Sequence, residues 1–237
     1  PELVKKSAFR IDLAFRSPYR YMDEPEGYVP GTVWDKPGCY GGYYTKDQVK
    51  EIIDYARIRG VEVIPEIEMP GHNPELLGIH PELFCDEIIS KSSVCPSKDT
   101  TLNFFAGILD EIIELFPSQF IHIGGDEAPK SNWTVCADCQ RKIKEEGLRG
   151  EEGLQSWFIG KIDRYVKSRG RRIIGWDEIM QGGLSEGATV MSWNGTEQGL
   201  AAMEMGHDVI MTPTKYCYLD YYQSAPQYEP MAICGYV

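Results

Sequence analysis

The sequence has 237 residues, with 24 Lys or Arg against 36 Asp or Glu, so its formal net charge is −12. A surface that binds nucleic acid or an anionic membrane needs a net basic patch, and this balance argues against both partners. Hydrophobic residues make up 42% of the chain, which excludes a disordered protein. No apolar run approaches the roughly 20 residues of a membrane span. At this length we expect one domain over residues 1–237.

Residues 1–44 hold five prolines and five glycines among many aromatic side chains. This composition predicts a long loop whose aromatic residues pack on the rest of the domain. Thr45 is then predicted to cap a helix that ends at Gly60, because apolar residues recur at helical spacing between them. The β-branched segment over residues 61–67 predicts a short, buried strand.

Helices and strands alternate through the rest of the chain. We predict helices over residues 102–116, 154–169 and 197–205, and strands over residues 120–124, 172–176, 189–193 and 208–211. A repeated order of strand, loop and helix is typical of βα units, so we expect an α/β fold with a parallel sheet. With the segment over residues 61–67, the sheet has five predicted strands.

Polar and aromatic residues gather at the carboxyl ends of these strands. In chain order they are Glu66, Glu68 and His72; Asp126 and Glu127; Trp176, Asp177 and Glu178; Trp193 and Asn194; and, past the last strand, Tyr218 and Asp220. The carboxyl ends of parallel strands are where α/β barrels place their chemistry. One such acid alone is more simply explained as a helix cap or a solvated loop residue. Five strand ends with the same kind of residue favour a shared site.

The densest group is His122-Ile-Gly-Gly-Asp-Glu127. Its two glycines allow a sharp turn and leave room beside a ligand. Neighbouring carboxylates repel each other, so one of them tends to be held protonated near neutral pH, which suits a general acid. Adjacent acids cannot flank a glycosidic bond from opposite faces. If the protein is a glycosidase, its nucleophile must therefore come from elsewhere.

Five motifs together resemble a known family. They are His122-Ile-Gly-Gly-Asp-Glu127, Pro65-Glu-Ile-Glu-Met-Pro-Gly-His72, Gly175-Trp-Asp-Glu178, Ser192-Trp193 and Tyr218-Leu-Asp220. They occur in the order found in glycoside hydrolase family 20, the β-N-acetylhexosaminidases, and the resemblance spans the chain from about Tyr43 to Tyr222. It implies a TIM (β/α)8 barrel that removes terminal GlcNAc or GalNAc residues from glycans with retention. It implies no metal and no cofactor.

The resemblance assigns three catalytic residues. Glu127 is expected to act first as the general acid and then as the base. Asp126 is expected to orient the substrate's 2-acetamido group, whose carbonyl oxygen attacks the anomeric carbon to give an oxazolinium intermediate. Tyr218 is expected to donate a hydrogen bond to the acetamido oxygen. The substrate then supplies the missing nucleophile, as in the substrate-assisted glycosidases.

The resemblance also assigns residues that bind the sugar or support the catalytic ones. Trp176 and Trp193 are expected to wall the acetamide pocket, and their ring faces suit the apolar faces of sugars. Asp220 is expected to accept hydrogen bonds from sugar hydroxyls. His72 is expected to support the acid at the substrate-binding site; a structural histidine at a strand end is the alternative. Glu178 is expected in a supporting role, orienting its neighbours.

The chain departs from the family pattern at both ends. The family's first strand with its sugar-binding Arg, its His-x-His strand, and its last strand with a Trp and a Glu have no counterpart here. A closed barrel has eight strands. We therefore expect this chain to hold strands three to seven of a barrel, with open sheet edges through which copies self-associate.

Two other functions remain open from the sequence. The first is a non-catalytic sugar-binding fragment with the same pocket and no turnover. The second is a two-carboxylate retaining glycosidase that uses Glu127 together with Glu178. The preference for GlcNAc or GalNAc and the aglycone stay open as well.

The chain has seven cysteines, so they cannot all pair with one another. Cys136 and Cys139 form a lone CxxC without a second such pair or a nearby pair of histidines, which favours a disulfide or two ordinary thiols over a zinc site. Cys85 and Cys95 flank a polar loop and are a further candidate bridge. Because such enzymes trim cell-surface or polymeric glycans, we expect a periplasmic or secreted protein.

Overall fold

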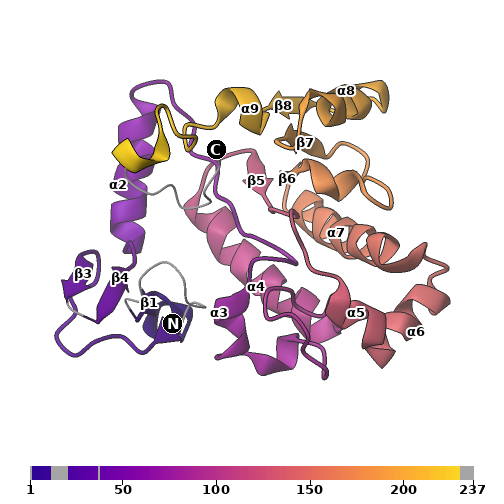
Figure 1. The fold of residues 1–237 in the computed structure, drawn as a ribbon, viewed down its shortest axis with the longest axis horizontal. Helices are drawn as coiled ribbons and strands as arrows, with labels where there is room; N and C mark the ends of the chain where they lie inside the picture. The colour runs from indigo at the N-terminus through magenta and orange to yellow at the C-terminus, as the bar shows by residue number, and fades with distance from the viewer. Residues whose placement is uncertain (1, 12–20, 37, 230–237) are drawn as a thin grey trace.

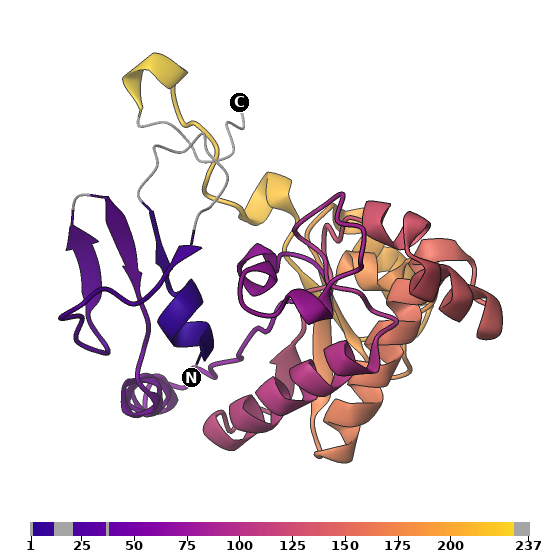
Figure 2. The ribbon, with the colours of Figure 1, turned by 90° about the horizontal axis from the view of Figure 1, so that it is seen from below.

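A computed structural model describes residues 2–11, 21–36 and 38–229 (Figure 1). An antiparallel sheet near the N-terminus is followed by a parallel sheet with helices along one face. In Figure 2 the antiparallel sheet and helix α2 lie to one side of the parallel sheet and its helices. Within the described ranges, the helices are too short or too polar to cross a lipid bilayer.

The N-terminal region is a small folded unit, so the loop predicted over residues 1–44 is wrong. Its elements are α1 (Glu2–Ser7), β1 (Phe9–Arg10), β2 (Tyr21–Met22), β3 (Val33–Lys36) and β4 (Cys39–Gly42). The four strands pair antiparallel in the order β2-β1-β4-β3. Residues 12–20 and residue 37 of the predicted loop lie outside the described ranges.

Close packing of strands and aromatic rings explains why this unit is rich in glycine and aromatic residues without being a loop. Gly41 lies in β4 against β1, where a Cβ atom would collide with the backbone of Ala8 and Phe9. Phe9 and Tyr28 meet edge to face with their ring centroids 4.7 Å apart, and Tyr43 lies 5.4 Å from Tyr28. The glycine therefore serves close strand contact and not only a turn, and the aromatic residues form the unit's own core.

Helix α2 (Lys46–Arg57) confirms the predicted helix and its cap. The Thr45 hydroxyl accepts a hydrogen bond from the Gln48 backbone N–H at 3.2 Å, and the Gln48 side chain accepts one from the Thr45 backbone N–H at 3.0 Å. This is a capping box, which satisfies donors that the first turn leaves unpaired. The helix contacts α4, but none of its residues is buried, and Ile52 is 42% exposed.

The strand predicted over residues 61–67 is wrong. The segment makes a single parallel bridge, from Glu66 to His122. The Pro65 carbonyl accepts a hydrogen bond from the His122 N–H, and the Ile67 N–H donates to the His122 carbonyl, both at 2.9 Å. Pro65 itself has no N–H to extend the ladder. Val61 is 57% exposed, so the start of the segment is not buried either.

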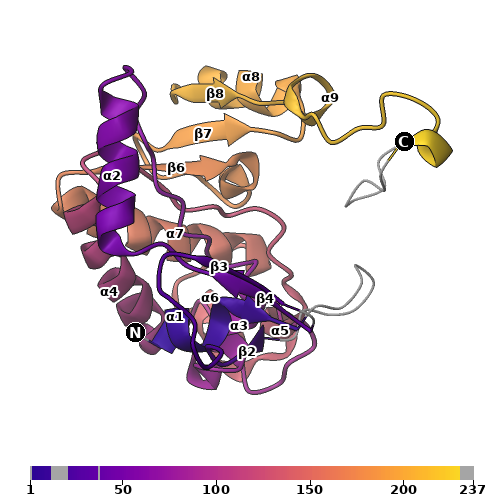
Figure 3. The same cartoon turned by 90° about the vertical axis from the view of Figure 1, so that its left-hand side faces the viewer.

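The parallel sheet confirms the other four predicted strands. They are β5 (Phe120–His122), β6 (Arg172–Trp176), β7 (Thr189–Ser192) and β8 (Val209–Met211), paired in that order. The predicted helices correspond to α4 (Asp99–Leu115), α7 (Gly150–Ser168) and α8 (Thr196–Glu204). Figure 3 shows β6, β7 and β8 side by side, with their arrows pointing the same way. The connections also hold α3 (Pro74–Leu77), η1 (Pro81–Leu83), α5 (Ser131–Val135), α6 (Ala137–Glu145), η2 (Asp177–Met180), α9 (Thr214–Cys217) and η3 (Pro226–Tyr228), which pattern reading did not predict.

The main core lies between this sheet and its helices. Ile121, Ile173 and Val190 from neighbouring strands pack with Phe105 of α4 and Phe158 of α7. Because side chains alternate across a strand, the residues directly before and after each of these three face the opposite side of the sheet. Within the described residues, α4 and α7 pack on one face of this sheet, and the four parallel strands do not close on themselves.

Candidate active site

The register of the parallel strands brings their carboxyl ends to one edge of the sheet. His122 pairs with Ile174, Trp176 pairs with Met191, and Ser192 pairs with Met211. The predicted polar residues follow these positions directly in the chain. The expectation that they share one edge is therefore met for the ends of β5, β6 and β7.

Asp126 and Glu127 meet His72 at the end of β5. Nε2 of His72 lies 3.3 Å from Oδ2 of Asp126 and 3.4 Å from Oε2 of Glu127. The side chain of Asp126 is 18% exposed, whereas that of Glu127 is 59% exposed. His72 and Glu127 are also the non-glycine residues with positive φ in the described chain, at 51° and 45°. Such strained backbone clusters at functional sites, where the surrounding structure holds it in place.

Gly124, the first of the two glycines before the acids, makes room for a third carboxyl group, that of Glu68. Gly124 has a φ of 67°, and a Cβ atom there would collide with the Glu68 carboxyl group. The backbone N–H of Gly125 donates a hydrogen bond of 2.9 Å to Oε1 of Glu68. A Cβ atom on Gly125 would collide with Ile179 of η2. The sequence predicted room beside these glycines, and the structure shows that Glu68 occupies it at Gly124 and Ile179 occupies it at Gly125.

Glu68 is the carboxyl group whose acidity the fold changes most clearly. Burial and the negative charge of Asp126 raise the pKa of Glu68 to about 10. Glu68 is therefore protonated at neutral pH, because the charged form is disfavoured both by desolvation and by a like charge. Sequence reasoning placed Glu68 at a strand end but gave it no role, since only the fold sets it beside Asp126.

Asp126 keeps an acceptor atom for another group. Its Oδ1 atom is buried and accepts no hydrogen bond from an N–H or hydroxyl group of the described residues, although the Glu68 carboxyl group hydrogen-bonds to the Asp126 side chain. Buried polar atoms are rarely left unpaired, so this oxygen is positioned to accept a hydrogen bond from a bound molecule.

Trp176 is fixed at the end of β6 by contacts with Glu66 and His122. Its indole Nε1–H donates a hydrogen bond of 3.0 Å to Oε1 of Glu66. The same oxygen lies 3.2 Å from Nδ1 of His122, and the rings of His122 and Trp176 meet edge to face at 4.9 Å. The adjacent His122 ring lowers the pKa of Glu66, so its carboxylate stays charged beside both rings. Sequence reasoning gave Glu66 and His122 no role.

Trp193 is held by the two acids that follow β6. Oδ2 of Asp177 accepts hydrogen bonds from the backbone N–H groups of Trp193 at 2.9 Å and Asn194 at 3.0 Å, and Oδ1 accepts one from the Asn194 side chain at 2.7 Å. Oε2 of Glu178 accepts a hydrogen bond of 2.9 Å from the Trp193 indole. Burial raises the pKa of Glu178. Glu178 thus contacts a candidate pocket residue, and Asp177 is a positioning residue that the sequence placed at this strand end without a role.

Tyr218 follows α9 and stacks on Trp193. Their ring centroids lie 6.5 Å apart with an interplanar angle of 16°. Asp220 is exposed on the segment that follows. The structure therefore groups His72 with the acid pair, and Trp193 with Glu178 and Tyr218. It leaves Asp220 at the surface.

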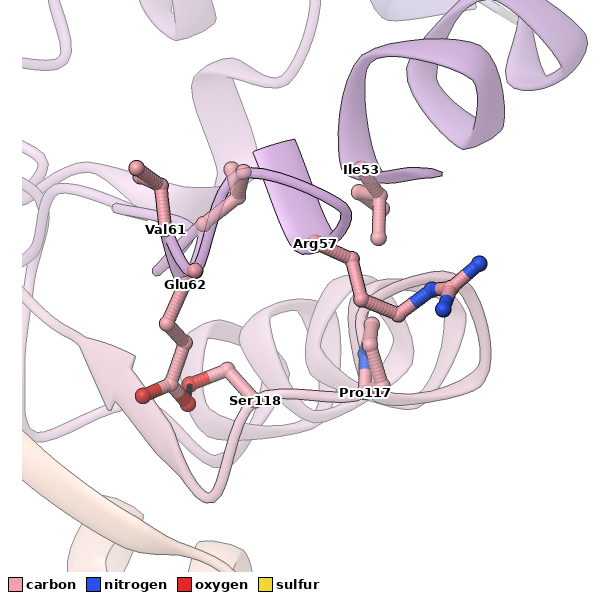
Figure 4. A pocket seen from close by; sticks show the side chains of 8 residues that line it. Ile53, Arg57, Val61, Glu62, Pro117 and Ser118 are labelled. Atoms are coloured by element: carbon pink, nitrogen blue, oxygen red, sulfur yellow. Dashed lines mark hydrogen bonds between the residues drawn. The ribbon is translucent and has the colours of Figure 1, made fainter. Parts of the chain in front are cut away.

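A hollow of about 300 Å³ lies at the opposite end of the sheet (Figure 4). It opens between the last turn of α2, where Arg57 lies, and the segments around Val61 and Pro117. Oε1 of Glu62 accepts a hydrogen bond of 2.7 Å from the Ser118 hydroxyl on its wall. Because these residues precede the strands, the hollow is separate from the carboxyl-end residues.

In the part of the chain that the structure describes, two groups of side chains offer several possible metal ligands. His72, Asp126 and Glu127 present ligand atoms within 4.8 Å of one another, but two of the three are exposed to solvent. Exposed acidic groups of this kind are common without an ion. The second group consists of four buried cysteines and is distinct from the acid pair.

Comparison with known proteins finds a matching family model and relatives of the same family. A family model described as "Glycosyl hydrolase family 20, catalytic domain" matches residues 1–237. A β-hexosaminidase of Porphyromonas gingivalis is 46% identical over 207 residues, which cover 83% of this chain and 27% of that protein. A β-hexosaminidase of Vibrio furnissii is 35% identical over 202 residues, covering 81% of this chain and 33% of that protein.

Solved structures agree with these matches. The β-N-acetylhexosaminidase of Bacteroides fragilis superposes with a TM-score of 0.72 at 35% identity, covering 78% of this chain and 39% of that one. An exo-β-N-acetylglucosaminidase of Vibrio harveyi, in complex with N-acetylglucosamine, superposes with a TM-score of 0.73 at 30% identity, covering 79% of this chain and 31% of that one. The chain thus spans between 27% and 39% of the length of these four relatives.

Proposed function

Because the chain belongs to glycosyl hydrolase family 20, whose members are TIM-barrel β-hexosaminidases, we propose that the protein that contains it hydrolyses terminal, non-reducing β-N-acetylhexosamine residues of glycans. We propose a substrate-assisted retaining mechanism. The observation that carries it is the buried Oδ1 of Asp126, to which no N–H or hydroxyl group of the described residues donates, beside the accessible carboxyl group of Glu127.

In the first step the substrate's own acetamido group is the nucleophile. Oδ1 of Asp126 accepts the acetamido N–H, which directs the carbonyl oxygen at the anomeric carbon. A bond forms between that oxygen and the anomeric carbon as the glycosidic C–O bond breaks. Glu127 gives its proton to the departing oxygen, and a cyclic oxazolinium ion remains. Adjacent acids suit this chemistry because neither one has to attack from the opposite face.

In the second step water completes the hydrolysis. Glu127, now a carboxylate, takes a proton from the water whose oxygen attacks the anomeric carbon. The bond from the acetamido oxygen to that carbon breaks, and the sugar leaves with its original configuration. Contact of His72 with both carboxylates supports a role in holding them in place.

Aromatic side chains form the proposed acetamide pocket. Trp176 is anchored by Glu66, Trp193 is anchored by Glu178, and Tyr218 stacks on Trp193. Rigid ring faces suit the apolar faces of a sugar ring. We propose that the Tyr218 hydroxyl donates to the acetamido oxygen and that Asp220 accepts from sugar hydroxyls.

The test compares two substitutions in a protein that contains the whole barrel. Glu127→Gln should lose about 10²–10⁴-fold in rate on poor leaving groups, and less on good ones, because proton donation matters most when the leaving group is basic. Asp126→Asn should lose rate on both, because it weakens the internal nucleophile. Equal rate losses for Glu127→Gln on good and poor leaving groups would contradict the assignment of Glu127 as the general acid.

The choice of substrate separates the other two functions. A substrate-assisted enzyme cleaves a chromogenic N-acetylglucosaminide and leaves the matching glucoside intact. A two-carboxylate enzyme that used Glu127 with Glu178 would cleave both, and a non-catalytic sugar-binding protein would cleave neither. The hydrogen bond from the Trp193 indole to Glu178 supports an orienting role for that acid.

We also propose a periplasmic or secreted location for the parent protein, where terminal sugars of large glycans are accessible. The test is fractionation of the cells that naturally produce the protein. Recovery of the protein in the cytoplasmic fraction would contradict this location.

A further inference from the structure

Four cysteines come together in a second, smaller core. Cys85, Cys95, Cys136 and Cys139 are 2%, 0%, 8% and 0% exposed, respectively. All four Sγ atoms lie within 4.8 Å of one another. The Sγ atom of Cys139 is 3.9 Å from that of Cys85 and 3.5 Å from that of Cys95. The fold therefore supplies the second pair of thiols that the sequence did not show beside the CxxC.

The spacing of the sulfur atoms fits a tetrahedral metal better than disulfides. A disulfide needs its sulfur atoms about 2.05 Å apart. Four thiolates at the Zn–S distance of about 2.3 Å lie about 3.8 Å from one another in a tetrahedron. The two distances, 3.5 and 3.9 Å, lie on either side of that value. The thiols are thus already spaced as ligands of one ion.

We propose that Cys85, Cys95, Cys136 and Cys139 bind a single Zn²⁺ ion as a structural site. Soft thiolate ligands in a tetrahedral set select zinc among the common divalent ions. Four protein ligands leave no open position for water or substrate, so the ion is structural and not catalytic.

Neighbouring groups suit the negative charge of such a site. The Ser97 hydroxyl lies 3.2 Å from Sγ of Cys95 and 3.4 Å from Sγ of Cys139, so it can donate to a bound thiolate. Cys136 is the N-cap of α6, and Cys139 lies in its first turn, where backbone N–H groups favour negative charge. Outer donors of this kind orient and tune metal ligands.

The ion would fasten a part of the chain that has little regular structure. Residues 84–98 contain no helix or strand, and α5 has only five residues. Side-chain hydrogen bonds already join the two segments: the Trp133 indole donates to the Val94 carbonyl at 2.9 Å, and the Asn132 side chain accepts from the Ile89 N–H at 2.8 Å. Small units with little core of their own commonly depend on a metal or disulfides.

The same connection holds both sides of the candidate active site. The Ser92 hydroxyl accepts a hydrogen bond from the His72 backbone N–H at 3.2 Å. The Ser93 hydroxyl donates one of 2.6 Å to the carbonyl of Pro129, two residues after Glu127. Both serines lie between two of the cysteines in the chain. A zinc ion here would therefore position the His72 and Glu127 segments relative to each other without touching substrate.

The first experiment measures metal and thiols in the complete protein, purified without chelators. We expect about one zinc per chain, no disulfide among the four cysteines, and release of zinc when a mercurial titrates their thiols. Two disulfides without metal, or four free thiols without metal in zinc-supplemented buffer, would overturn the proposal.

A pair of substitutions separates metal loss from ordinary core damage. Cys136→Ser should abolish stoichiometric zinc and lower the Tm. Cys39→Ser is the matched control, because Cys39 is equally buried but packs with Phe9 and Tyr28 in the N-terminal unit. That variant should keep its zinc. Full zinc content in Cys136→Ser would contradict the site.

A third measurement avoids substitution, in case Cys136→Ser does not fold. The unsubstituted protein is stripped with a chelator and reloaded with Co²⁺ or Zn²⁺. Cobalt should show the intense visible bands and thiolate charge-transfer absorption of a tetrahedral tetrathiolate, and zinc should restore the original Tm. A cobalt spectrum without thiolate bands, or a Tm that does not respond to chelation, would refute the proposal.

Discussion

Replacing Glu68 by Gln should stabilise the protein, and increasingly so as the pH rises. The folded state keeps the Glu68 carboxyl group protonated, because burial and the charge of Asp126 raise its pKa to about 10. In the unfolded chain the same group has its ordinary value of 4.5 and is ionised at neutral pH. Glutamine is neutral in both states, and its Oε1 atom can still accept the hydrogen bond from Gly125.

The size of the effect follows from proton linkage. The raised pKa means that the folded state binds one more proton than the unfolded state, so the contribution of Glu68 is fully present below pH 4.5 and is lost as the pH rises towards 10. Each pH unit in that window costs about 1.4 kcal/mol. Between pH 4.5 and pH 7 the accumulated cost is about 3 kcal/mol, which is the stabilisation expected for Glu68→Gln at pH 7.

Urea unfolding of both proteins at several pH values between about 5 and 8 checks this expectation. The difference in unfolding free energy should grow by about 1.4 kcal/mol per pH unit. The control is Glu197→Gln, which removes an exposed carboxylate of the same length and should give a small difference at every pH. A difference between Glu68→Gln and the unsubstituted protein that stays constant across the range would refute the reasoning, because it would mean that Glu68 is ionised in the folded state.

Two further expectations concern Asp177 and the isolated chain. Asp177→Asn should cost about 2–4 kcal/mol in urea unfolding and raise KM, because the carboxylate accepts hydrogen bonds from the Trp193 and Asn194 backbones; unchanged stability would contradict that anchoring role. The 237-residue chain expressed alone should self-associate in gel filtration, because β8 is a sheet edge and apolar side chains such as Met203 are exposed by 58%. A well-behaved monomer with ordinary activity on an N-acetylglucosaminide would overturn that expectation.

The sequence by itself determined the order of the main helices and strands and the family of the chain. Amphipathic spacing from Thr45 onward predicted α2, and the same reasoning predicted α4, α7 and α8, because a helix that packs on a sheet must repeat its apolar residues every three to four positions. The Gly-Gly-Asp-Glu127 motif by itself indicates the carboxyl edge of the sheet. These are local patterns, and a single chain displays them directly.

Only the tertiary structure decided which distant residues share a contact. Gly41 belongs to the loop predicted from the sequence, but it lies in a strand that pairs with Phe9 at close range. The β-branched residues after Gly60 read as a strand, but pairing extends to a single bridge at Glu66. In both cases the partner strand, and not the local propensity, decided whether the segment forms a strand.

The same limit applies to the chemistry. Glu68 is protonated because the fold buries it beside Asp126, which lies 58 residues further along the chain. The sequence around Glu68 contains no pattern that predicts this contact. The sequence suggests that Cys85 and Cys95 form a disulfide across a loop. In the structure, the connection before α4 places both of them next to Cys139. Burial and charge proximity depend on three-dimensional distance, so the sequence supplied the candidate groups, and the tertiary structure set their acidity and their ligand geometry.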